Sequence, residues 1–112
     1  MSQDLLKELR GKVDVINLQL LELLNQRARV VSEIGKVNSN LGNPFYDPVR
    51  EGEMLQALEM ANQGPFSNDT IKALFKEIFR ASLAFEEAQT KAKIKVQRKG
   101  PGERTVIMMP DG

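Results

Sequence analysis

The chain has 112 residues, a formal net charge of +1 and neither cysteine nor histidine. This length suits one domain with a single modest core, and the missing residue types exclude disulfides, thiolate chemistry, imidazole bases and the usual zinc sites. No apolar run approaches the ~20 residues of a membrane span, and the N-terminus lacks the basic and apolar features of a signal peptide, so we expect a cytoplasmic protein with no membrane partner.

Apolar residues at the start of the chain recur in alternating steps of three and four, which predicts one long helix packed along its length against other helices. We expect it to begin near Ser2 or Asp4, either of which can cap it, and to end between Asn38 and Pro44, where glycine and proline interrupt the pattern. The apolar members of this seam are Leu6, Leu9, Val13, Ile16, Leu20, Leu23, Val30, Ile34, Val37 and Leu41.

The predicted helix is longer than its own domain. It spans about 50 Å, whereas a compact chain of this size has a radius of gyration near 13 Å. A second copy of the chain would cover the outer turns, so we expect a homodimer. A lone long helix on the surface is the alternative.

One charged residue, Arg27, occupies a position in the apolar seam. Burying a guanidinium is costly unless it meets an anion, and no acidic residue shares the seam. Either a carboxylate from elsewhere in the fold reaches Arg27, or the anion is a ligand held between helices. Arg10 lies beside the seam residue Leu9, near the end of the helix that a dimer would insert into its partner.

A second helix is expected from Pro48 to about Asn62, because Asp47 can cap it and proline is tolerated in the first turn. Arg50 and Glu51 fall in that first turn. These two residues either belong to a site or are ordinary surface charges.

A third helix is expected to be capped by Ser67 or Asn68 and to end before Lys95. Its apolar face continues into Ser82 and Glu86, which are four residues apart and therefore share a face. This polar pair either closes a site or lies in a helix end that frays into solvent.

The last segment, 93–112, is expected to be a linker or tail that is disordered or docks on another domain, after a helical domain over 1–92. Gly100, Pro101 and Gly102 forbid a continued helix, and a short strand-like run follows over 105–109. The segment is basic, but it has neither interleaved aromatic residues nor a paired basic face, so we expect no nucleic-acid binding.

These elements together predict an all-α fold, a three-helix chain with one long N-terminal helix. The predicted inward-facing polar residues have no metal-ligand spacing and include three arginines, which bind carboxylates through paired hydrogen bonds. The set describes a cage for a small dianion. Its members are Arg27, Arg50, Glu51, Ser82 and Glu86, with Arg10 supplied by a partner chain.

Five segments, in this order and spacing, resemble the all-α chorismate mutases over residues 4 to 90. Within that family they look most like the mutase domains fused ahead of a 3-deoxy-D-arabino-heptulosonate 7-phosphate synthase, and the tail looks like the connector into such a synthase. The segments are Leu9-Arg10, Leu23 to Arg27, Glu33 to Lys36, Asp47 to Glu51, and Leu74 to Phe79 with Ser82 and Glu86.

The resemblance implies an intertwined homodimeric helical bundle that rearranges chorismate to prephenate, on the route to phenylalanine and tyrosine, without a cofactor or metal. Each of two equivalent sites would be completed by the partner's first helix. Arg10 from the partner and Arg27 would clamp the substrate carboxylates, with Arg50 and Ser82 supporting that end. Glu51 and the backbone at Asp47 would take the substrate hydroxyl, and position 86 would face the ether oxygen.

Two residues depart from the family pattern. Members usually carry a lysine at the position of Asn38, where it donates to the ether oxygen, and Lys36 is about 200° away round the helix and cannot simply replace it. Many relatives have glutamine where this chain has Glu86, and a glutamate donates a hydrogen bond only when it is protonated. We therefore expect a weak mutase whose turnover increases as the pH falls.

Two other functions are compatible with the same residues. A regulatory module could sense chorismate or prephenate for an attached synthase, with residual mutase activity; Asn38 and the linker-like tail favour it. A plain dimerisation coiled coil is the second alternative, but it leaves Arg27, Ser82 and Glu86 unexplained.

Overall fold

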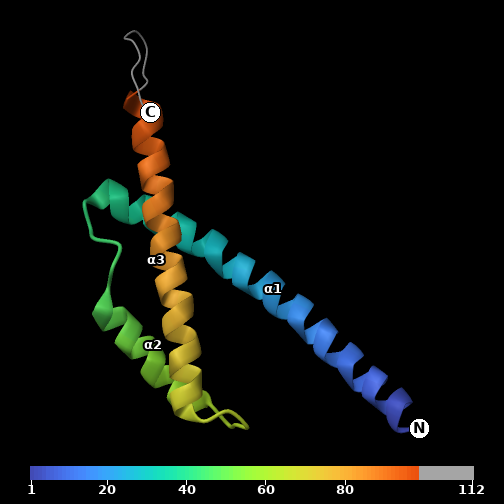
Figure 1. Cartoon of the computed structure of the whole chain (residues 1–112). Coiled ribbons are helices and arrows are strands. Elements are labelled where there is room, and N and C mark those ends of the chain that lie inside the picture. Colours follow the sequence, from blue (N-terminus) through green and yellow to red (C-terminus); the bar gives the residue numbers. More distant parts are fainter. Residues whose placement is uncertain (99–112) are drawn as a thin grey trace.

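A computed structural model describes residues 1–98, which form three helices and no strand. The helices are α1 (Ser2–Leu41), α2 (Pro48–Ala61) and α3 (Asn68–Arg98). Figure 1 shows α3 lying alongside α2 and crossing the C-terminal part of α1, while the N-terminal half of α1 extends away from both. The prediction of an all-α chain with one long first helix is confirmed.

Both ends of α1 have a local cause. Ser2 is the first residue of α1, and Met1 is its N-cap without a side-chain capping bond. The predicted cap at Ser2 or Asp4 is therefore wrong. Asp4 instead lies in the first turn, where a carboxylate favours the positive helix end. The helix stops at Gly42, whose φ of 75° is left-handed and suits glycine. This end agrees with the prediction.

The shorter helices begin as predicted. Asp47 caps α2, because its Oδ1 accepts a hydrogen bond from the backbone N–H of Arg50 at 3.0 Å. Ser67 caps α3 in the same way, accepting from the backbone N–H of Thr70 at 3.1 Å.

The predicted end of α3 is wrong, because the helix continues past Lys95 to Arg98. The segment from Lys91 to Arg98 contains neither glycine nor proline, so nothing in it breaks a helix. The predicted division between residues 92 and 93 falls inside this helix. The segment 99–112, which includes the predicted strand-like run, lies outside the described residues.

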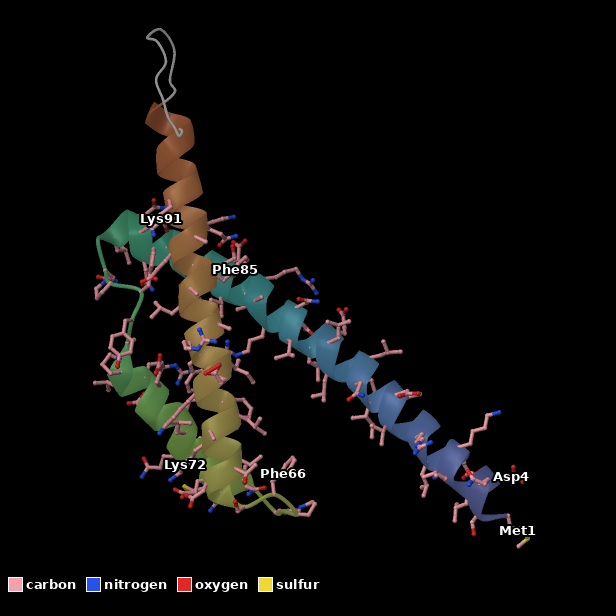
Figure 2. All side chains as sticks on the ribbon, in the orientation of Figure 1. Met1, Asp4, Phe66, Lys72, Phe85 and Lys91 are labelled. Atoms are coloured by element: carbon pink, nitrogen blue, oxygen red, sulfur yellow. The ribbon has the colours of Figure 1, made fainter. Side chains whose placement is uncertain are left out.

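The described chain is elongated and leaves most of its apolar side chains uncovered. Its radius of gyration is 20.2 Å, against about 13 Å for a compact domain of this length. The seam residues Leu9, Ile16 and Leu23 are 47%, 53% and 60% exposed, and side chains project freely along the N-terminal half of α1 (Figure 2). Within residues 1–98, no helix carries an apolar stretch long enough to cross a membrane.

Candidate functional site

A pocket of about 530 Å³ lies between α1 and α2, both of which pack against α3. This volume is in the range of small-molecule sites, ~300–1,000 Å³. Seven of the eight predicted site residues line it, from four parts of the chain: the C-terminal half of α1, the cap of α2, the first turn of α2 and the middle of α3. They are Arg27, Asn38, Asp47, Arg50, Glu51, Ser82 and Glu86.

Arg10, the eighth predicted residue, does not line this pocket. It lies on α1, seventeen residues before Arg27, which corresponds to about 25 Å along a helix. That distance exceeds the reach of an arginine side chain. Arg10 therefore cannot serve the pocket of its own chain.

Arg27 is held in the pocket wall by two contacts with α3. Its Nη1 donates a hydrogen bond to Oγ of Ser82 at 2.6 Å, and its guanidinium carbon lies 5.4 Å from the ring centroid of Phe79, within cation–π range. Ser82 in turn donates to the carbonyl oxygen of Ile78 at 2.8 Å. These contacts fix the guanidinium without neutralising it.

No carboxylate among residues 1–98 forms an ion pair with Arg27. Two sources of an anion for Arg27 were expected: a carboxylate from elsewhere in the fold, or a ligand. The described part of this chain does not supply the carboxylate. A half-buried cation with only neutral partners attracts an anion from outside the chain.

Glu86 is a buried carboxylate that lines the same pocket from α3, four residues after Ser82. It is 8% exposed and packs against Gly35, the buried residue of α1. Burial raises the pKa of the Glu86 carboxyl above its ordinary value; the charge of Arg27 opposes this rise and that of Glu87 adds to it. Because Glu86 is buried and α3 continues well beyond it, the alternative of a fraying helix end is wrong.

The start of α2 also contributes polar residues to the pocket. Asp47 is held by its capping bond to Arg50, and Glu51 is half-buried one residue further along the helix. Arg50 is exposed on the single chain but still borders the pocket. Both residues in the first turn of α2 thus face the cavity rather than only the outer surface.

Sequence reasoning missed several apolar residues of the pocket. Phe45 and Met54 line it from the loop before α2 and from α2 itself. Met54 lies three and four residues after Glu51 and Arg50, so the helical repeat could have placed it on their face. Phe45 gave no such signal, because it belongs to no periodic segment. The other apolar lining residues are Val30, Val31, Ile34, Phe75, Phe79 and Leu83.

The combination of three helices, a long first helix and an arginine-rich pocket agrees with the family comparisons. Residues 9–87 match the family described as chorismate mutase type II, and the chain belongs to this family.

A solved structure of chorismate mutase (form II) from Thermus thermophilus is 52% identical, with a TM-score of 0.74; the match covers 75% of this chain and 96% of that one. A bifunctional chorismate mutase/prephenate dehydratase from Pseudomonas aeruginosa is 38% identical over 90 residues, covering 76% of this chain and 25% of the relative. The T-protein of Haemophilus influenzae is 38% identical over 82 residues, covering 72% and 22%. The chain spans about a quarter of the length of these curated relatives.

The names of these relatives bear on one finer expectation. They describe a fusion with prephenate dehydratase and a T-protein, so they do not support the predicted special likeness to mutase domains fused to a heptulosonate phosphate synthase.

Proposed function

We propose that this chain is a chorismate mutase, which rearranges chorismate to prephenate in aromatic amino-acid biosynthesis. The observation that carries the proposal is the Arg27 guanidinium, which is fixed on Ser82 and Phe79 but not paired with any carboxylate of residues 1–98. A dicarboxylate substrate supplies the missing anion. The family to which the chain belongs is the second support.

The reaction breaks an ether C–O bond while a C–C bond forms within the same molecule, so it requires no nucleophile, general base or cofactor. The protein has to hold the substrate in its compact conformation and stabilise the negative charge that grows on the ether oxygen. Arg27 binds one substrate carboxylate, and Arg50 and Ser82 support that end of the site. Glu51 and the backbone at Asp47 form hydrogen bonds with the substrate hydroxyl. Glu86 and Asn38 donate to the ether oxygen.

Glu86 can play this part only in its protonated form, because a carboxylate has no proton to donate. Its burial favours that form, and the negative charge of a bound dicarboxylate favours it further. The direction of this pKa shift therefore supports the proposed role.

The site is completed by a second copy of the chain. The exposed apolar seam on the N-terminal half of α1 needs a cover, and Arg10 is too far along α1 to reach its own pocket. A homodimer in which each α1 extends over the partner's pocket satisfies both requirements and brings a third guanidinium to the substrate. The cytoplasm, where we expect the protein, suits this biosynthetic role.

A regulatory function is the second candidate, and Asn38 favours it. A neutral amide stands where the family usually places a lysine, which weakens stabilisation of the ether oxygen more than it weakens binding. In this regulatory function, the domain binds chorismate or prephenate and controls an attached 3-deoxy-D-arabino-heptulosonate 7-phosphate synthase.

One pair of measurements separates the two functions. Purified chain is incubated with chorismate while prephenate formation is followed, and prephenate binding is titrated on the same sample. Saturable turnover that is lost in Arg27→Ala supports the mutase. Binding without turnover supports the sensor, and the absence of both contradicts the proposal.

A further inference from the structure

Asn38 is tied to the loop that follows α1 by two contacts with one residue. The backbone N–H of Asn43 donates to the carbonyl oxygen of Asn38 at 2.8 Å, and Nδ2 of the Asn43 side chain lies 3.5 Å from Oδ1 of Asn38. Gly42, with its φ of 75°, makes the turn that brings Asn43 back over the helix end. The amide oxygen of Asn38 is thus directed at the loop.

This contact determines which end of the amide remains for the pocket. An asparagine side chain has one acceptor oxygen and one donor NH₂ group. With the oxygen bound to Asn43, the NH₂ group of Asn38 is left over, and it has no hydrogen-bond partner among residues 1–91, whose side chains the structure describes. Asn38 is half-buried and lines the pocket together with Glu86.

We propose that Asn43 is a positioning residue that holds Asn38 with its NH₂ group toward the pocket, so that the amide donates to the substrate's ether oxygen. The inference rests on the proposed mutase function. It assigns a role to a residue outside the pocket, and it explains how a neutral side chain can act where a charged one is usual.

The orientation matters because the two ends of the amide have opposite effects. The NH₂ group stabilises negative charge on the ether oxygen, whereas the carbonyl oxygen would repel it. Without the Asn43 side chain, the Asn38 amide can present either its NH₂ group or its oxygen to the pocket. The difference in free energy between these two orientations is then smaller by one neutral hydrogen bond. We therefore expect Asn43→Ala to lower kcat about fivefold, with little change in KM.

Asn43→Asp gives the sharper result. A carboxylate at position 43 only accepts hydrogen bonds, so it attracts the NH₂ group of Asn38 and turns the carbonyl oxygen toward the pocket. We expect kcat to fall further than in Asn43→Ala, by at least about tenfold. Asn40→Ala, an exposed asparagine on the same helix end, is the matched control and should retain wild-type turnover.

Repeating both changes in an Asn38→Ala background isolates the effect. Asn43→Ala and Asn43→Asp should then cause no further loss of kcat, because no amide remains to be oriented. Equal losses in both backgrounds, wild-type turnover in Asn43→Asp, or wild-type turnover in Asn38→Ala would each overturn the inference while leaving the mutase function in place. A wild-type chain that forms no prephenate overturns both. Circular dichroism melts of every variant report whether the helix end has been lost.

Discussion

Glu86 packs against Gly35, and its carboxylate lies next to the place that a side chain at position 35 would occupy. A β-carbon at position 35 would lie 3.1 Å from Oε2 and 3.4 Å from Cγ of Glu86. The glycine permits the close approach of α1 and α3 at this point, and the approach seats the carboxyl group in the pocket wall.

Gly35→Ala should therefore displace Glu86 by a few tenths of an ångström. We expect kcat to fall by about tenfold, since misplacement by about 1 Å can cost a hundredfold. The matched control is Gly52→Ala on α2, where an added β-carbon meets open space. That variant should keep its turnover and gain about 0.5–1 kcal/mol in the free energy of unfolding. Wild-type kcat in Gly35→Ala would contradict the role given to this contact.

The pH dependence of turnover tests the protonated form of Glu86. Burial raises the pKa of its carboxyl above 4.5, so the fraction able to donate a hydrogen bond increases as the pH falls from about 8 to about 5. Wild-type kcat should increase over this range. Glu86→Gln donates at every pH, so its profile should be flat and its kcat at pH ~8 should exceed that of the wild type. A flat wild-type profile would remove the proposed role of Glu86.

The same pKa shift affects stability. Because the folded carboxyl holds its proton at pH values where the unfolded one has lost it, the free energy of unfolding should decrease as the pH rises from below 4.5 through the folded pKa, and then level off. Glu86→Gln lacks this titration. Denaturant unfolding of both proteins should show the variant gaining stability relative to the wild type as the pH increases. A pH-independent difference would indicate that Glu86 is not buried in the protein that was measured.

Asn38→Lys should increase kcat at least about tenfold, because an ammonium group donates as the amide does and adds a positive charge opposite the ether oxygen; one preorganised donor is typically worth about 3 to 4 kcal/mol of the barrier. The new ammonium group also lies in the pocket with Glu86 and should lower the pKa of that carboxyl, which moves the pH profile to lower pH. Asn40→Lys adds the same charge at an exposed position on the same helix end and should leave kcat unchanged. A lower kcat in Asn38→Lys would show that the residue does not occupy the family's lysine position.

Arg27→Ala and Arg10→Ala should each lower kcat at least about a hundredfold, because each removes a guanidinium that binds the substrate. Arg29→Ala, on the outer side of α1 and paired with Glu22, should retain activity. The decisive measurement is to unfold and refold the two inactive variants together. If each site takes Arg27 from one chain and Arg10 from the other, half of the dimers are mixed and each has one intact site, which restores about a quarter of wild-type activity. No recovery in verified mixed dimers would show that the site is not shared.

Local patterns in the sequence determined the three helices and most of their ends. The steps of three and four predict α1, Gly42 ends it, and Asp47 with Pro48 starts α2, because helix formation and capping depend on residues a few positions apart. Arg27 could be singled out for a related reason: a cation in an apolar seam is anomalous in the sequence itself.

Only the tertiary structure decided which distant residues meet. Gly35 and Glu86 are on different helices, and Phe45 belongs to no periodic segment, so their places in the site follow from the way in which α1, α2 and α3 pack. The contact of Arg27 with Ser82 has the same origin. Crossing of helices depends on side-chain packing between segments far apart in the chain, and a periodic pattern identifies the packing face without identifying its partner.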